Sequence, residues 1–141
     1  MKIKCSGIVH YPDGVVLVRD KGGAEWRLPE RQLDETEDVL LCIRRCVLMQ
    51  TGYRIQKLRF YKVHTQARTA KQGALLHFIF GCEISGEPIQ AAELEAAHFS
   101  PNEVTTLAAK GKFNDRVLLD LLHRYHALVP PPSHGTHNPL T

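Results

Sequence analysis

The sequence predicts one domain of the α+β class, whose order of strands, helix, strands, helix also fits an α/β/α sandwich. Three observations lead to this prediction. Strand-like apolar runs occupy parts of residues 2–29 and 53–84, helical patterns occupy residues 39–50 and 115–128, and no segment repeats another. The chain has 141 residues, 43% of them hydrophobic, which is enough for one core. We assign residues 1–128 to this domain and residues 129–141 to a proline-rich tail without a periodic pattern.

The N-terminal part is predicted to form three strands. "KIKCSGIVHY" and "GVVLVRD" are joined by the turn "YPDG", in which Pro12 and Gly14 supply turn chemistry. "EWRLP", residues 25–29, is predicted as a short third strand.

Residues 39–50 have the length and pattern of a helix. Thr36 or Asp38 is a suitable N-cap, and Gly52 is a suitable stop. The acidic residues before the helix would complement the positive end of its dipole. They are Glu30, Asp34, Glu35 and Asp38.

The second half continues with strands and then helices. "YRIQKLRFYKVHTQ", "ALLHFIFGCEI" and "EAAHF" are predicted strands, with the turn "SGEP" between the last two. Ser100, Pro101 and Glu103 have the spacing of a capping box that opens a helix. Residues 115–128 form a final amphipathic helix whose apolar face contains Val117, Leu118, Leu121, Leu122 and Tyr125.

Composition disfavours several classes of function. The net charge is +3 and the basic residues are dispersed apart from Arg44 and Arg45, so we expect no nucleic-acid partner. No run approaches the roughly 18 apolar residues of a membrane span, so we expect no membrane partner and a cytoplasmic protein. The cysteines lack the paired spacing of a zinc ribbon, and the sequence places no third ligand beside the two His-x-x-His pairs, so we expect buried free thiols and surface histidines. These residues are Cys5, Cys42, Cys46, Cys82, His123, His126, His134 and His137.

Residues 26–53, "WRLPERQLDETEDVLLCIRRCVLMQTGY", resemble the signature of the Nudix superfamily, W-x-L-P-G followed by G-x5-E-x7-R-E-U-x-E-E-x-G-U, where U is bulky and apolar. The matching positions are Trp26, Leu28, Pro29, Glu37, Arg45, Val47, Gly52 and Tyr53. "GIVHYPDGVVLVRD" and "HFSPNEVTTL" are similar to the flanking segments of the family, so the resemblance covers residues 3–127. It implies an α/β/α sandwich around a central mixed β-sheet, and relatedness to enzymes that hydrolyse nucleoside diphosphate derivatives.

The sequence departs from the signature where the family holds its divalent cations. Cys46, Met49 and Gln50 replace the three glutamates after the arginine, and Arg31 replaces the glycine that opens the signature. Mg²⁺ prefers oxygen ligands, whereas Cys and Met are soft ligands and Gln offers one neutral carbonyl. We therefore expect no metal at these three positions, and Mg²⁺ or Mn²⁺ as a cofactor only if the protein is active.

The resemblance also supplies the candidate site residues. Glu37 and Arg45 are retained signature positions, which in the family chiefly organise the loop–helix–loop. Glu93 and Glu95 lie where many members keep a supplementary base or metal ligand, although exposed surface glutamates are at least as good an interpretation. Arg19, Lys21, Arg27 and Arg31 are candidate phosphate ligands, with a solvated surface as the alternative.

The helix over residues 39–49 is apolar on nearly every side. Val39, Ile43, Cys46 and Val47 form one stripe, while Leu40, Leu41, Leu48 and Met49 point in other directions. Either these four are scattered exposed residues, or the old catalytic face has become a contact surface, covered by a second subunit in a homodimer or by the C-terminal tail.

Three functions follow from these observations. The first is a Nudix-fold protein that binds a nucleoside diphosphate derivative with weak or no hydrolysis. The second is an active hydrolase with a rearranged metal site, for example one built from Glu37, Glu93 and Glu95. The third is a protein-interaction module that uses the apolar helix.

Overall fold

The computed structural model describes residues 1–128 of the chain, and the side chains of residues 1–122. The predicted tail, together with His134 and His137, lies outside the described residues, as do the side chains of His123, Tyr125 and His126. The elements are β1 (Lys2–Tyr11), β2 (Gly14–Arg19), β3 (Glu30–Leu33), α1 (Val39–Thr51), β4 (Lys57–Gln66), β5 (Leu75–Glu83), β6 (Glu95–Phe99), α2 (Pro101–Ala109) and α3 (Arg116–Leu128).

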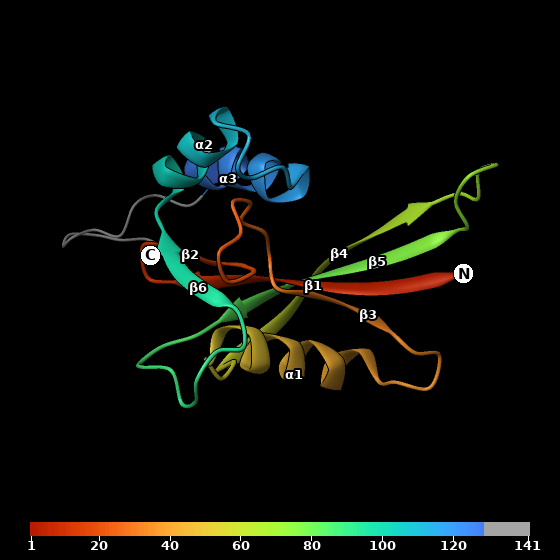
Figure 1. The fold of residues 1–141 in the computed structure, drawn as a ribbon, viewed down its shortest axis with the longest axis horizontal. Helices are drawn as coiled ribbons and strands as arrows, with labels where there is room; N and C mark the ends of the chain where they lie inside the picture. Colours follow the sequence, from red (N-terminus) through yellow and green to blue (C-terminus); the bar gives the residue numbers. More distant parts are fainter. Residues whose placement is uncertain (129–141) are drawn as a thin grey trace.

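The elements form an α/β/α sandwich, which confirms the predicted fold class. A mixed six-stranded sheet lies between α1 on one face and α2 and α3 on the other (Figure 1). The strand order is β4-β5-β1-β2-β6, and β1 is parallel to β5 and antiparallel to β2. β3 pairs with the first half of β1, and β2 pairs with its second half. The sheet therefore forks beside β1, and β3 leads the chain from the fork towards α1.

The position of the third strand differs from the sequence prediction, which placed it at residues 25–29. Trp26 and Arg27 form only isolated bridges, to Phe113 and Val18, and the strand itself is Glu30–Leu33. "ERQL" has a weak intrinsic preference for strand, so its pairing with β1 decides the structure.

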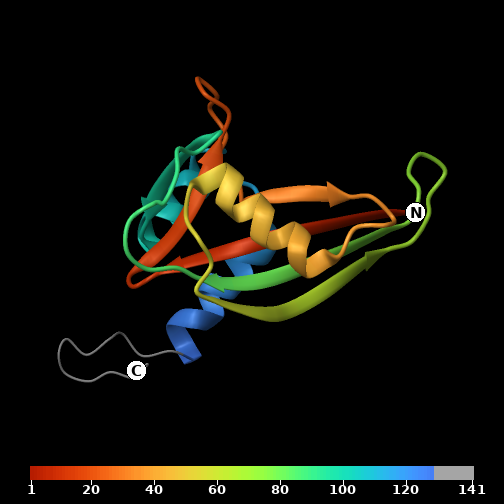
Figure 2. The same cartoon turned by 90° about the horizontal axis from the view of Figure 1, so that it is seen from below.

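α1 begins at the predicted residue and ends at Thr51, one residue beyond the predicted range and directly before the predicted stop at Gly52. The Asp38 carboxylate accepts hydrogen bonds from the backbone N–H groups of Leu40 (2.8 Å) and Leu41 (3.2 Å), and the helix ends at Gly52, whose φ is 82°. The helix lies across the sheet in Figure 2. Gly7 allows this close approach, because a Cβ there would lie 3.1 Å from both Cys82 Sγ and Val47 Cγ2.

α2 and α3 pack on the opposite face around Trp26 and Phe113, through a second core cluster. The capping box at Ser100 and Glu103 is confirmed. Both helices lie over one end of the sheet, and the β4–β5 hairpin extends beyond them (Figure 1). Within residues 1–128, no helix covers the half of this sheet face to which the β4–β5 hairpin belongs.

Two further sequence predictions concern the cysteines and the membrane. All four cysteines are buried free thiols, as expected. In residues 1–128, no helix is both long enough and apolar enough to cross a bilayer.

Candidate functional site

The loop before α1 holds Glu37 through contacts close to it in the chain. Glu37 Oε1 accepts a hydrogen bond from the Asp34 backbone N–H at 2.9 Å, and Glu37 Oε2 lies 3.7 Å from Arg31 Nη2. Glu37 thus pairs with Arg31, and the structure does not bring it to Arg45. These contacts brace the loop that leads into α1.

Arg45 lies on the outer face of α1, exposed to solvent. It lines a pocket of about 250 Å³ together with Arg44, Leu48, Arg54 and Ile55. Among the described side chains Arg45 forms no ion pair. Glu37 and Arg45 are therefore separated: Glu37 belongs to the loop before α1, and Arg45 belongs to an outward-facing pocket.

The three positions that carry glutamates in the Nudix signature differ in their surroundings. Cys46 is only 2% exposed, and burial raises the pKa of its thiol to about 12. Met49 is exposed at the surface. Gln50 donates a hydrogen bond from Nε2 to the backbone carbonyl of Glu30 at 2.9 Å, and its Oε1 is buried without a partner among the described residues.

These residues do not fit a hard divalent cation. A buried protonated thiol, a thioether and an amide whose N–H group points at the nearest backbone carbonyl cannot replace three carboxylates. Within residues 1–122, no three His, Cys, Asp or Glu side chains converge as metal ligands. The Glu30 carboxylate forms an ion pair with Lys4, in which Glu30 Oε2 lies 3.3 Å from Lys4 Nζ.

Glu93 and Glu95 do not form a joint acidic site. Glu93 is exposed, and its backbone N–H donates to the Met49 carbonyl at 2.8 Å, near the end of α1. Glu95 accepts a hydrogen bond from Arg19 at 2.7 Å, which lowers the pKa of the Glu95 carboxyl and raises that of Arg19. Because Glu95 is paired with Arg19 and its lowered pKa makes the carboxylate a weaker base, it is poorly suited to act as a general base.

The arginines predicted as phosphate ligands are each paired with a carboxylate. Besides its contact with Glu95, the Arg19 guanidinium lies 4.4 Å from the centre of the Trp26 ring. Arg27 contacts Asp20 at 3.0 Å, and Arg31 contacts Glu37. Their charges are partly satisfied within the protein, and they do not gather around one pocket in the described structure.

A polar cluster on the other face of the sheet was not anticipated from the sequence. The Ser6 hydroxyl is buried and lies 2.6 Å from His77 Nε2, and Lys4 and Glu30 lie beside them. Burial and, to a smaller extent, the charge of Lys4 lower the pKa of His77. We call this cluster, with Lys62, the polar sheet face.

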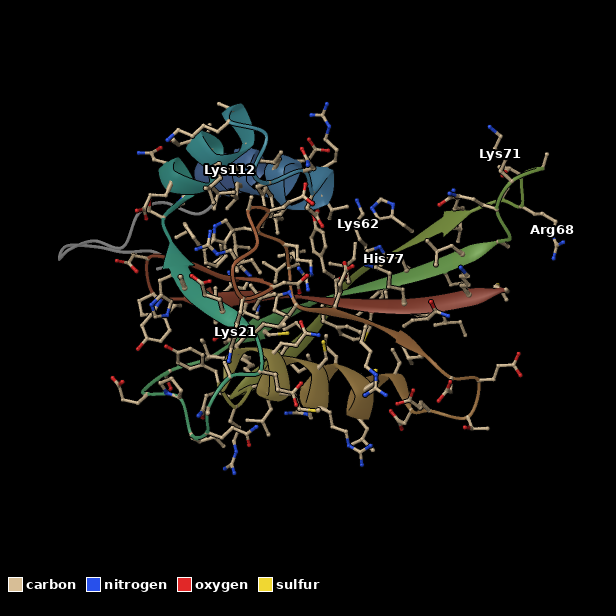
Figure 3. The ribbon with its side chains drawn as sticks, viewed as in Figure 1. Lys21, Lys62, Arg68, Lys71, His77 and Lys112 are labelled. Carbon is tan, nitrogen blue, oxygen red and sulfur yellow. The ribbon has the colours of Figure 1, made fainter. Side chains whose placement is uncertain are left out.

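Lys62 belongs to the polar sheet face because it pairs with Ile79, two residues beyond His77 in β5. Figure 3 shows Lys62 and His77 together on the half of the sheet that α2 and α3 leave open. The only sequence signal was the alternation of Lys4 and Ser6 with the apolar residues of β1. The cluster combines residues from four strands, so sequence spacing alone could not reveal it.

A mixed sheet with a loop–helix–loop docked on it defines the class of protein. The NUDIX domain profile matches residues 3–122, and the chain therefore belongs to the Nudix family. No curated protein sequence matches it.

Solved structures share this fold. A NUDIX hydrolase from Nitrosomonas europaea has 20% identity and a TM-score of 0.69, with 89% of this chain and 88% of that chain covered. An ADP compounds hydrolase has 16% identity and a TM-score of 0.68, with 89% and 71% covered. A MutT NUDIX hydrolase from Burkholderia pseudomallei has 17% identity and a TM-score of 0.58, with 79% and 96% covered.

Proposed function

We propose that the protein binds a nucleoside diphosphate derivative and hydrolyses it weakly or not at all. The observation that carries this proposal is the contact between Gln50 Nε2 and the Glu30 carbonyl. It connects the end of α1 to β3 by a direct hydrogen bond, in a region where the family's signature calls for metal-binding carboxylates. The frame of the fold is retained, and the chemistry of its ligand positions has changed.

The polar sheet face supports the binding half of the proposal. Lys62 and His77 offer N–H donors on the part of the sheet that α2 and α3 leave open, and Lys62 has no ion-pair partner among the described side chains, whereas Lys4 beside them is paired with Glu30. Lysine is a common phosphate ligand. The similarity to an ADP compounds hydrolase makes ADP derivatives the first ligands to test.

The alternative is an active hydrolase with a relocated metal site. Glu93 favours it most, because its backbone lies next to the end of α1 and its side chain is exposed. Glu37 and Glu95 are each engaged with an arginine, so such a site would need both ion pairs to break.

Isothermal titration calorimetry with ADP, ADP-ribose, nucleotide sugars and dinucleotides tests the binding proposal. We expect at least one of them to bind, and Lys62→Glu to weaken that binding. Lys110→Glu, at the exposed end of α2, is the matched control and should bind as the wild type does. If no phosphorylated ligand binds, or if both variants behave alike, the proposed site is wrong.

A further inference from the structure

The charges of this protein are strongly segregated along the chain. Residues 39–82 contain no Asp or Glu, whereas they contain eight arginines and lysines. This stretch forms α1, β4 and all of β5 except its last residue, Glu83, so these three elements carry positive charge and a single carboxylate. The basic residues are Arg44, Arg45, Arg54, Lys57, Arg59, Lys62, Arg68 and Lys71.

Three of these residues converge on one pocket between the end of α1 and the start of β4. Arg44, Arg45 and Arg54 line it, and Leu48 and Ile55 supply its apolar part. We call these five residues the arginine pocket. Among the described side chains, none of its three arginines forms an ion pair. This distinguishes them from Arg19, Arg27 and Arg31, which all have carboxylate partners.

Apolar side chains extend the arginine pocket along the same side of the sheet. Leu41 is 48% exposed and lies one helical turn before Arg44 and Arg45 on the outer face of α1. Phe60 is 58% exposed, and its ring contacts Phe78 and Phe80 on the α1 side of the sheet. The surface thus combines unpaired positive charge with exposed hydrophobic area, which marks interaction sites.

The composition of this surface defines what would fit it. A double-stranded nucleic acid presents its phosphates outward and keeps its bases stacked inside, so it would pair with the arginines but leave Leu41 and Leu48 in water. A second copy of this chain fits poorly, because Arg44 and Arg45 lie at the middle of α1. A two-fold contact along this helix would place each arginine opposite its own copy, and like charges opposed in an interface disfavour it.

We propose that the arginine pocket and Leu41 dock an acidic amphipathic segment of another protein. Its apolar side chains would lie against Leu41, Leu48 and Ile55, and its carboxylates would pair with the three arginines. Guanidinium groups bind carboxylates through two parallel hydrogen bonds, so such pairs give both orientation and affinity. An amphipathic helix laid in a groove is a common mode of peptide recognition. This interaction is independent of the ligand proposed for the polar sheet face.

Selection from a random peptide library displayed on phage tests the proposal without assuming a partner. We expect enriched peptides to carry Asp or Glu together with apolar residues at helical spacing. Binding of the enriched peptides, measured by fluorescence anisotropy, should weaken on the order of tenfold or more in Arg44→Glu/Arg45→Glu, because truncating or reversing charge pairs in interfaces has effects of this size.

Lys112→Glu is the matched control, because Lys112 is an exposed cation on the α2–α3 side of the sheet (Figure 3). It should leave peptide affinity unchanged. Arg44→Gln/Arg45→Gln should give an intermediate loss, and circular dichroism should show all variants folded. Binding of a labelled single-stranded oligonucleotide is measured in the same anisotropy assay. Analytical sedimentation shows whether the protein self-associates.

Four results would overturn the proposal. They are no enrichment, enrichment of basic or neutral peptides, equal binding by the charge-reversed variant, and tighter binding of the oligonucleotide than of any acidic peptide. Self-association that Arg44→Glu/Arg45→Glu abolishes would also overturn it, because the occupant would then be a second copy.

Discussion

Introducing a glutamate at position 46 restores one carboxylate of the Nudix signature, and its consequences follow from the burial of Cys46. The Cys46 side chain is 2% exposed, and the pKa of its thiol rises from 9.0 to about 12, mainly because of burial. A carboxyl group in the same environment would undergo a rise of similar size, from about 4.3 to roughly 7.3. Since each pKa unit corresponds to about 1.4 kcal/mol, Cys46→Glu should lower the free energy of unfolding by roughly 4 kcal/mol above pH 7.

The sign of the pH dependence follows from the raised folded-state pKa. Below about pH 4 the carboxyl group is protonated in both folded and unfolded states, so the penalty vanishes. As the pH rises through about 4 to 7, the unfolded state ionises first and becomes favoured. Thermal unfolding at pH 7.5 should therefore show a Tm roughly 10–15 °C below that of the wild type, and the difference should shrink towards pH 4.

Cys46→Gln is the control, because it has a similar size and no charge. Its loss of stability should not depend on pH over this range. If Cys46→Glu keeps the wild-type Tm at pH 7.5, or recovers it when Mg²⁺ is added, position 46 accepts an ionised ligand. The conclusion that position 46 cannot hold an ionised metal ligand would then be wrong.

Three further predictions concern packing, thiols and charge. Gly7→Ala should destabilise the protein by about 1–3 kcal/mol, because its Cβ would crowd Cys82 Sγ, whereas Gly73→Ala, with no atom within 4 Å, should not; urea denaturation compares them. The four cysteines should resist Ellman's reagent at pH 8 in the native protein and react fully in guanidinium chloride, and rapid native labelling would contradict their burial. Glu95→Gln should lower the Tm at pH 7, and the loss should shrink as the pH falls through the lowered pKa of Glu95, because the pairing with Arg19 stabilises the fold only while the carboxyl is ionised; a loss that does not change with pH would exclude the ion pair as the cause.

Elements whose ends are set by neighbouring residues could be predicted from the sequence. Asp38 and Gly52 set the ends of α1 through their own side chain and backbone, and the Ser100 capping box sets the start of α2. The third strand was misplaced because β3 depends on pairing with β1, a contact between residues far apart in the chain.

The contacts within the candidate site could be predicted less well from the sequence. Substitution of the metal-binding glutamates is visible in the chain itself, but the partners of the retained residues are not. Glu37 contacts Arg31, and the predicted phosphate ligand Arg19 is occupied by Glu95. The basic residues look dispersed when they are counted along the chain. In the fold, the loop after α1 brings Arg54 to the same pocket as Arg44 and Arg45, which a count along the chain does not show.

Measuring product formation at saturating ligand tests directly whether the protein binds a nucleoside diphosphate derivative without hydrolysing it. The wild type and Met49→Glu/Gln50→Glu would be incubated with Mg²⁺ or Mn²⁺ and a ligand identified by calorimetry, and the cleaved nucleotide would be quantified by chromatography. We expect the wild type to bind the ligand and to release product no faster than a reaction without protein. Metal-dependent turnover by the wild type, lost in Glu93→Gln, would contradict it and establish a relocated metal site.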